Sequence, residues 1–484
     1  MPLYDNMYNP YDLLAELIAR CKGMVPPRHK ALDQKEDERI RQQAVALWEP
    51  YQKSLKHAAR LGLDPQVAQS LRAKCEQIKD YHTLRWLVIE LDQYLTWEQF
   101  AGQQKDKPFF AMNDNMEQTQ IVLIPKVPAV HTHYGETERI GAQRWYRELN
   151  ERLHHCWYVP VQSLTCDGVT YTLENVIYQP EYTTTNREDI QLAFSPISNR
   201  PMEDTLYVED TMVYENGNSY HCFTVNGVQD PDYFTERFFR LYQAACQHGA
   251  DIVMAPEMLC SDALFEVDRY GYNVLLNQCA RNADSKVPAL VLAPTYAADK
   301  RNQLRVYNAN GRVLLTQDKQ YPFIDKKNGG SREEDLSNGC HCIELLHIPY
   351  WGRLAFPICI DFLQTRYRDI LIRDLGANLL LCPAYSAGST QFEQAMQAGV
   401  EFHTACVWGN SCSSLQPNWS RAECTGAVHL ANVGEKAHPL RFEPQCGGEC
   451  KEYCMFLVRI PLNYAGPTRR QDIGPSVEHM IGDA

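Results

Sequence analysis

The chain has 484 residues, which is too long for one ordinary hydrophobic core and predicts two domains. Hydrophobic residues make up 44% and charged residues 22%, a balance typical of folded rather than disordered proteins. The 60 acidic and 47 basic residues give a net charge of -13, and a field of that sign disfavours nucleic acid as a partner.

No segment contains the roughly 18 to 20 uninterrupted apolar residues that a membrane-spanning helix needs. Residues 1–5 lack the basic start and the apolar stretch of a secretory signal. We therefore expect a cytoplasmic protein that has no membrane partner and whose 18 cysteines are reduced thiols.

The first hundred residues are expected to be helical. Apolar residues recur every three or four positions on both sides of Pro50, which should kink or divide the helix. Asp64 and Pro65 are typical of a helix start. The apolar positions of this helical pattern are Ile40, Ala44, Leu47, Tyr51, Leu55, Ala58, Val67, Leu71, Ile78, Leu84, Leu87, Leu91 and Tyr94.

A short β section follows. Residues 161–166 and 169–173 flank Asp167 and Gly168, a pair that favours a two-residue hairpin turn. The polar stretch 182–204 predicts the domain boundary. We expect an N-terminal region over residues 1–200, a second domain over 201–465 and a C-terminal tail over 466–484.

In the second domain, strands and helices alternate. The pattern predicts a helix over 231–249, then buried strands over 250–255, 287–293, 354–360 and 377–382, and a hairpin around Asn310 and Gly311. Another helix is expected between the last two strands. This alternation is typical of an α/β fold.

Three polar residues follow predicted strands of this domain. Glu257 comes after Pro256, Lys319 after the hairpin, and Cys359 where a strand should turn into a helix. Together they have the chemistry to cleave an amide: the thiol attacks, the carboxylate takes and returns its proton, and the ammonium stabilises the oxyanion.

The sequence around each of these residues resembles a motif of the nitrilase (carbon–nitrogen hydrolase) superfamily. Residues 247–257 resemble the glutamate motif, 318–323 the lysine motif, and 349–361 with 375–383 the nucleophile motif. The three occur in the family's order over about residues 205–462, a little over half the chain.

The resemblance implies a four-layer α-β-β-α sandwich that dimerises or forms larger homo-oligomers, and an enzyme that needs no cofactor. Glu257 would be the general base, Lys319 the oxyanion-stabilising residue and Cys359 the nucleophile. Many members have a second glutamate between the lysine and the cysteine. Glu333 matches it better and Glu334 is the alternative, while an acidic surface loop remains the other interpretation.

The segment after the nucleophile departs from the family pattern. Where members carry a Pro-Glu pair and an arginine, this chain has Arg366 and Arg368 in a different context. We expect them, with Tyr385, to contribute to substrate binding, and an acidic substrate would suit the arginines. A solvated helix face is the alternative explanation for the two arginines.

Cys446, Cys450 and Cys454 recur every fourth residue, with Cys424 and His438 nearby. The usual zinc signature pairs cysteines in two clusters, and only one is visible, so we expect no metal.

The resemblance favours an amidohydrolase that cleaves a non-peptide C–N bond of a small amide, ureide or nitrile. The alternative is an interaction or effector subunit of a larger assembly, such as a bacterial defence system, whose triad is silent or depends on a partner. The N-terminal region could then bind a protein partner, because the catalytic domain does not require it.

Overall fold

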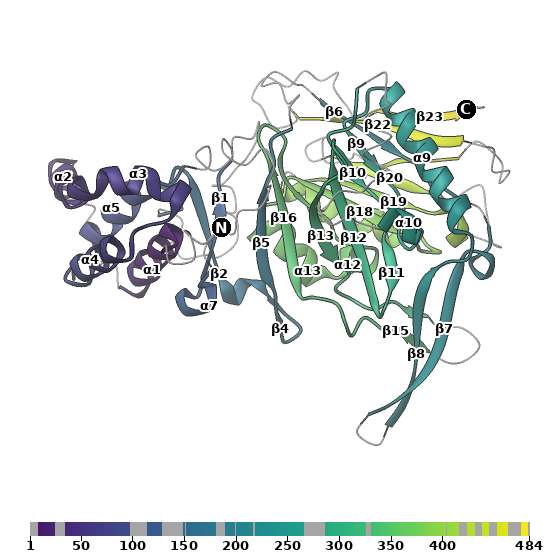
Figure 1. Cartoon of the computed structure of the whole chain (residues 1–484), viewed down its shortest axis with the longest axis horizontal. Coiled ribbons are helices and arrows are strands. Elements are labelled where there is room, and N and C mark those ends of the chain that lie inside the picture. Colours follow the sequence, from purple (N-terminus) through teal and green to yellow (C-terminus); the bar gives the residue numbers. More distant parts are fainter. Residues whose placement is uncertain are drawn as a thin grey trace. The chain divides into compact units, whose positions relative to one another are not determined.

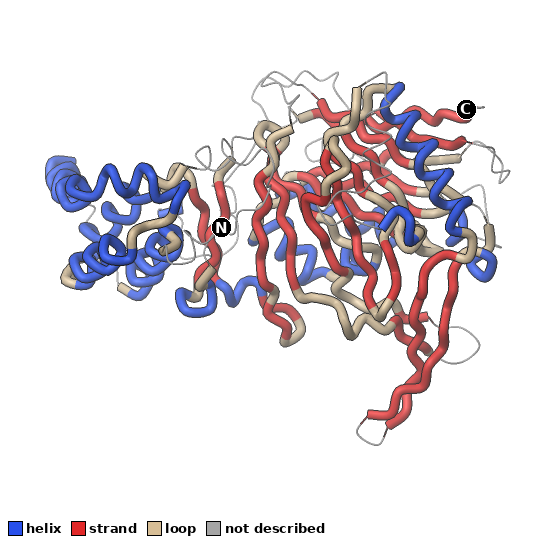
Figure 2. Tube along the Cα trace, viewed as in Figure 1, coloured by secondary structure: helices blue, strands red, loops and turns tan. Residues whose placement is uncertain are grey.

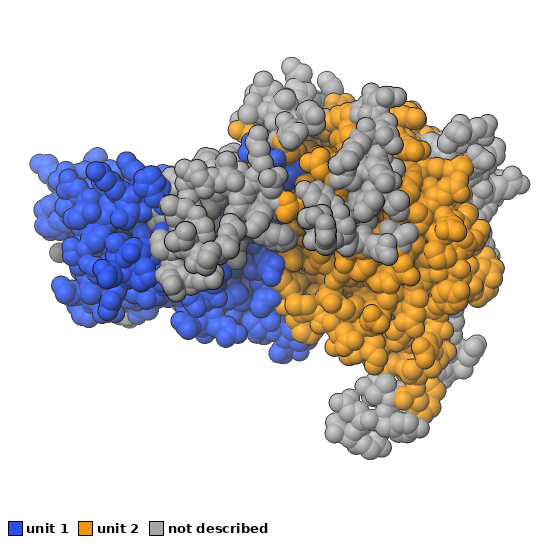
Figure 3. Space-filling view, viewed as in Figure 1, with its two compact units in different colours: residues 1–179 blue, residues 180–484 orange. Residues whose placement is uncertain are grey.

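The computed structural model describes residues 8–24, 34–96, 114–127, 149–150, 152–180, 189–198, 200–215, 218–265, 286–325, 331–402, 404–415, 424–430, 438–444, 453–462 and 476–482. The chain divides into two compact units, Met1–Gln179 and Pro180–Ala484, which are coloured separately in Figure 3. None of the described helices combines the length and apolar composition that crossing a membrane requires.

The first unit is mainly helical, as the apolar pattern predicts (Figure 1). Asn9 caps its first helix and Asp64 caps another, each by accepting backbone N–H groups. Pro50 lies in a 3-10 turn between two helices, which confirms the predicted break. The helices are α1 (Pro10–Gly23), α2 (Gln34–Trp48), η1 (Glu49–Tyr51), α3 (Gln52–Leu61), α4 (Pro65–Glu76), α5 (Tyr81–Asp92) and α7 (Met116–Thr119).

The predicted β section is also present in this unit. Asp167 and Gly168 both have positive φ angles of 51° and 82° and turn a hairpin. The first predicted strand is shorter than expected, because η3 (Val161–Leu164) is a 3-10 turn. The strands are β1 (Ile121–Pro125), β2 (Cys156–Pro160), β3 (Thr165–Cys166), β4 (Val169–Thr170) and β5 (Thr172–Ile177).

The second unit contains a first sheet that has both parallel and antiparallel strand pairs. Its strands are drawn in red in Figure 2. Its order is β11-β12-β10-β9-β6-β22-β23, and β13 pairs with β12. The strands are β6 (Asp189–Phe194), β9 (Ile252–Met254), β10 (Leu290–Leu292), β11 (Tyr296–Ala298), β12 (Arg301–Asn308), β13 (Val313–Asp318), β22 (Tyr453–Pro461) and β23 (Ser476–Gly482). The predicted buried strands near 250 and 290 and the Asn310–Gly311 hairpin are confirmed.

A second sheet in this unit contains the strands on either side of Cys359. Within the unit its order is β21-β20-β19-β18-β17-β16. The strands are β16 (Cys342–Ile348), β17 (Gly352–Ala355), β18 (Leu379–Ala384), β19 (Ala405–Asn410), β20 (Gly426–His429) and β21 (Leu440–Arg441). The helices of the unit are η4 (Met202–Asp204), α9 (Pro231–Gln247), α10 (Asp262–Phe265), α12 (Ile360–Leu363), α13 (Thr365–Asp369), the π-helix η5 (Ile370–Asp374), α14 (Thr390–Met396), η6 (Gln397–Phe402) and η7 (Cys412–Leu415).

Neighbouring residues of β19 show how the layers stack. The Trp408 ring stacks on Phe392 of α14 at 4.7 Å between centroids. Gly409 faces the other way, where an added Cβ would meet Phe194 and Met254 of the first sheet. Because successive strand residues point to opposite faces, the second sheet has helix on one side and sheet on the other.

Helix α9 covers the outer face of the first sheet. Its buried residues Phe234, Phe238 and Leu241 share one hydrophobic core with Ala193 and Val253 of that sheet. The order is therefore helix, sheet, sheet, helix, which confirms the predicted α/β fold with a four-layer nitrilase-like sandwich and a helical N-terminal region.

A third, smaller sheet of the second unit contains Glu333 and Glu334. A long hairpin of β7 (Leu206–Glu215) and β8 (Asn218–Val228) pairs with β15 (Arg332–Glu334) and then β14 (Ile324–Asp325), in the order β14-β15-β8-β7. In Figure 1 this hairpin extends away from the two larger sheets.

Two predicted limits differ from the structure. The unit boundary falls between Gln179 and Pro180, because β6 already pairs with β9 of the second unit. The expected tail over 466–484 contains β23, which pairs with β22. The fifteen cysteines in the described ranges form no disulfide.

Candidate active site

Glu257 is placed by the end of β9. Ile252, Val253 and Met254 are fully buried in the sheet, and Glu257, three residues beyond, is itself 0% exposed. Its backbone N–H donates to the carbonyl of Ala384 at 3.3 Å, which ties it to the end of β18. A carboxylate buried this completely needs hydrogen-bond donors around it.

Lys319 supplies one of those donors from the end of β13. Its Nζ lies 2.8 Å from Glu257 Oε1 and 2.6 Å from Glu334 Oε2, and all three side chains are almost fully buried. Its backbone N–H donates to the Asn302 carbonyl at 2.8 Å. One ammonium group therefore bridges two buried carboxylates.

Cys359 lies at the turn between β17 and α12. Its φ angle is 50°, a left-handed conformation that is strained for a residue with a side chain. The backbone is held by a hydrogen bond from its N–H to the Pro383 carbonyl at 2.9 Å. The thiol is 4.0 Å from the Tyr385 carbonyl oxygen, and Glu257 is near enough for its charge to raise the pKa of the thiol. The predicted helix after Cys359 is present, although α12 has only four residues.

The second glutamate is Glu334, and the expectation for Glu333 is wrong. Glu334 is 4% exposed and bonds Lys319, whereas Glu333 is exposed. The two residues are neighbours on β15, so their side chains point to opposite faces of the sheet. Glu334 is fixed further by the Phe323 N–H, which donates to its Oε2 at 3.1 Å.

Burial and charge set the protonation of this group. Burial raises the pKa of Glu257, and the Lys319 ammonium opposes that rise. Burial lowers the pKa of Lys319, but the two glutamates outweigh it and hold the pKa well above its usual range. Burial and the nearby Glu257 charge raise the pKa of the Cys359 thiol, so the resting sulfur carries its proton.

Two further polar residues complete the cluster, and the sequence analysis did not single them out. Asn302 donates its amide to Glu257, and Asp361 accepts backbone N–H groups of Gln320, Tyr321 and Ile358. Asp361 thus ties the segment after Lys319 to the turn before Cys359. In β12, Asn302 alternates in step with the buried Leu304 and Val306, and that pattern could have identified it.

The three residues expected to bind substrate each make a hydrogen bond or ion pair within the chain. Arg366 pairs with Asp374 at 3.1 Å, and Arg368 donates to the Phe362 carbonyl at 3.0 Å. Tyr385 contributes its backbone, since its N–H donates to Glu257 Oε2 at 2.8 Å. Contact of these residues with a substrate stays a prediction.

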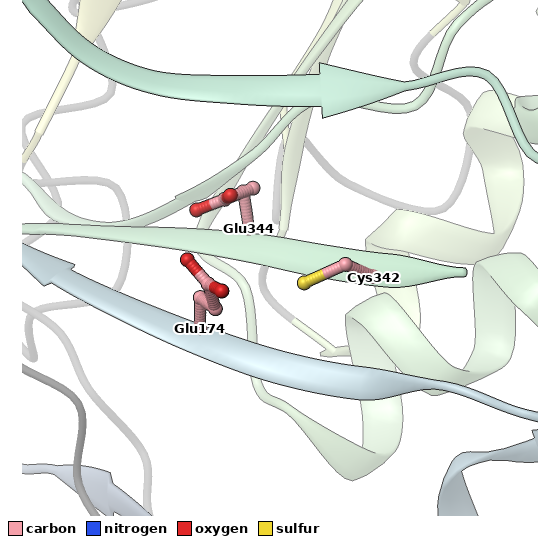
Figure 4. Close-up of side chains that lie close together, drawn as sticks. All are labelled: Glu174, Cys342 and Glu344. Atoms are coloured by element: carbon pink, nitrogen blue, oxygen red, sulfur yellow. The ribbon is translucent and has the colours of Figure 1, made fainter. Parts of the chain in front are cut away.

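Potential metal ligands occur outside this cluster. Cys446 and Cys450 lie outside the described residues, and Cys454 Sγ is 3.1 Å from His479 Nε2. Cys342 and Glu344, two residues apart on β16, both appear in Figure 4. The pair of Cys454 and His479 offers two ligands, fewer than a structural metal site requires.

Comparisons with known proteins add a likeness to solved structures. No protein-family model and no curated protein matches the chain. An amidase of the nitrilase superfamily from Nesterenkonia sp. AN1 matches 60% of this chain and 97% of its own, with 16% identity and a TM-score of 0.37. The C. elegans NitFhit protein matches 57% of this chain and 62% of its own, with 15% identity and a TM-score of 0.38. An N-terminal amidase matches 43% and 53%, with 10% identity and a TM-score of 0.22. Likeness of this degree says nothing about a substrate.

Proposed function

We propose that the chain is a thiol amidohydrolase that cleaves a non-peptide C–N bond of an amide, ureide or nitrile through an acyl-enzyme on Cys359. One observation carries the proposal: a lysine bridged between two buried glutamates lies beside a thiol on a strained turn. Buried charges of this kind are costly to a fold, so they favour a catalytic role over a structural one.

For an amide, the arrangement supports a two-step reaction. Glu257 takes the thiol proton as the Cys359 sulfur attacks the carbonyl carbon, and a C–S bond forms. The negative charge on the carbonyl oxygen is offset by Lys319, whose ammonium has three hydrogens and two glutamate acceptors among the described residues. The C–N bond then breaks, and the amine leaves with the proton held by Glu257.

Hydrolysis of the thioester completes the cycle. Glu257 takes a proton from water as the water oxygen attacks the acyl carbon, and the C–S bond breaks. The sulfur recovers a proton and the acid is released. An amine or alcohol in place of water would give acyl transfer by the same steps.

Covalent labelling tests the nucleophile. Fluoroacetamide leaves its acetamide moiety on the active-site cysteine of a mutant of the Nesterenkonia amidase, so it is a suitable probe. We expect one acetamide group on Cys359 by peptide mass spectrometry, and none at that position in Cys359→Ala. Buried Cys382 is the internal reference, because it is a thiol to which the proposal gives no role. Equal labelling of Cys359 and Cys382 would contradict the proposal.

Turnover is tested by ammonia release. A panel of primary amides should include one whose hydrolysis depends on Cys359 and is lost in Cys359→Ala. Added hydroxylamine should divert the acyl group to a hydroxamate if a thioester forms. Ammonia release that persists in Cys359→Ala would overturn the mechanism.

A partner-dependent enzyme is the second candidate, and the burial of the reacting groups favours it. Cys359 is 3% exposed and Glu257 0% exposed in the single chain, so binding of another chain could change the access of a substrate to them. We propose that this chain forms homo-oligomers or binds a protein partner through its N-terminal unit. Light scattering of the purified chain tests the first idea, and a mass of one chain at working concentration would exclude it.

A further inference from the structure

Asn302 is a neutral residue whose side-chain amide contacts both buried glutamates, Glu257 and Glu334. It projects from β12 and is 1% exposed. Its Nδ2 lies 2.8 Å from Glu257 Oε1 and 3.3 Å from Glu334 Oε1. The amide has two hydrogens, so it supplies one to each carboxylate.

The orientation of this amide is fixed by Thr295, which is 0% exposed. Thr295 Oγ1 accepts the Met258 N–H at 2.8 Å and lies 2.6 Å from Asn302 Oδ1. The hydroxyl therefore donates to Oδ1, which directs Nδ2 to the glutamates. The flipped amide would point Oδ1 at two carboxylates that are themselves only acceptors.

The cluster needs such a neutral donor because its charges do not balance. Two carboxylates share one ammonium group, that of Lys319, in a buried site. Like charges in low dielectric drive one of the pair to bind a proton. A protonated Glu257 could not take the thiol proton of Cys359.

We propose that Asn302, oriented by Thr295, is a positioning residue that keeps Glu257 ionised and directs its second oxygen toward Cys359. Glu257 Oε1 is occupied by Lys319 and Asn302, while Oε2 is held by the Tyr385 N–H at 2.8 Å. The inference rests on the proposed function, since it assigns Glu257 as the base.

The test follows the ionisation of Glu257 by measuring how fast the Cys359 thiol is alkylated, and it needs no substrate. The full-length chain is treated with iodoacetamide over a range of pH, and the alkylation rate at Cys359 is read by peptide mass spectrometry. The acid limb of this profile reports the ionisation of Glu257, and Glu257→Gln is the reference in which that limb is absent.

Loss of the amide should move the acid limb to higher pH. A hydrogen bond to a charged group that is lost in Asn302→Leu corresponds to a shift of about one pH unit. Asn302→Asp adds a third negative charge, so its limb should shift further in the same direction. The alkylation rate on the limb should fall roughly tenfold for each unit.

Thr295 provides a matched pair that separates hydrogen bonding from packing. Thr295→Val keeps the shape but loses the hydroxyl, and should shift the limb as Asn302→Leu does. Thr295→Ser loses a methyl group but keeps the hydroxyl, and should follow the wild type. Equal shifts in the two variants would mean that packing matters, which would overturn the role of Thr295.

The outcomes distinguish this inference from the proposed function. If Glu257→Gln removes the acid limb while Asn302→Leu and Asn302→Asp keep the wild-type profile, the inference is wrong and the base assignment stands. If Glu257→Gln itself keeps the wild-type profile, Glu257 is not the base. Both the role inferred for Asn302 and the proposed mechanism would then be wrong. Circular dichroism checks folding, and the Asp and Val variants keep the test usable if Asn302→Leu does not fold.

Discussion

Glu333 and Glu334 are adjacent, yet only one of them contacts Lys319, because side chains alternate along β15. Glu334 raises the pKa of Glu257 through its negative charge. In Glu334→Gln the acid limb of Cys359 alkylation should therefore move to lower pH, by about one unit, opposite to the Asn302 variants. Turnover should also fall about 10²-fold, because Lys319 loses an anchor next to the oxyanion.

Glu333→Gln is the matched control for this prediction. It removes the same charge from the exposed face of the same strand, so both the alkylation profile and the rate should stay within about twofold of wild type. A larger effect of Glu333→Gln than of Glu334→Gln would contradict the assignment.

Asp361 makes the stability of the fold depend on pH. Burial raises its pKa to about 7, from an ordinary value near 4. A carboxyl whose pKa is higher in the folded than in the unfolded chain stabilises the fold most at pH values below its pKa in the unfolded chain. This contribution is lost as the pH rises from about 4 to about 7.

Asp361→Asn removes this titration and also a hydrogen-bond acceptor for a backbone N–H. The variant should be less stable than wild type, and its deficit should shrink by about 3 kcal/mol between about pH 5 and about pH 8. Urea unfolding of both proteins at the two pH values measures this. A deficit that stays the same at the two pH values would show that Asp361 is ionised throughout, and would contradict the prediction.

At the scale of elements, the contact between the two large sheets depends on Gly409. A Cβ at this position would lie 2.4 Å from a Phe194 ring carbon and 2.5 Å from the Met254 methyl. Gly409→Ala should therefore destabilise the second unit by about 1 to 3 kcal/mol. At Gly388 an added Cβ meets nothing within 4 Å, so Gly388→Ala should unfold at the same urea concentration as wild type.

Elements with a local pattern could be predicted from the sequence, and elements that depend on distant pairing could not. β9, β10 and β18 are short apolar runs, as buried strands should be, and the helix α9 has a capping Asp230 and an apolar stripe. In β7, residues 206–212 are mostly exposed and mix acidic, apolar and hydroxyl residues, so no period marks this strand.

The same distinction holds in the candidate site. Strand ends identified Glu257, Lys319 and Cys359 as candidates, because each follows a recognisable apolar segment. The choice between Glu333 and Glu334 depends on the register of β15 against β8, which is more than 100 residues away in the chain. Local sequence contains no information on that pairing, and a shift of one residue exchanges the two faces.

At the scale of the whole molecule, each unit has its own hydrophobic core. Leu84 of α5 is buried in the core of the first unit and Leu241 of α9 in that of the second. Replacing either with alanine should cost about 2 to 5 kcal/mol in the unit that contains it. If the units unfold independently, each substitution should leave the other unit unaffected.

Hydrogen exchange measured by mass spectrometry can follow the two units separately. Leu84→Ala should speed exchange in α1, α2 and α5 and leave the Cys359 alkylation profile unchanged, whereas Leu241→Ala should speed exchange in α9, β6 and β9. If Leu84→Ala also changes alkylation at Cys359, the N-terminal unit influences the surroundings of this thiol in the second unit. The partner-dependent function would then become the stronger hypothesis, because a partner bound to residues 1–179 would have a route to the active site.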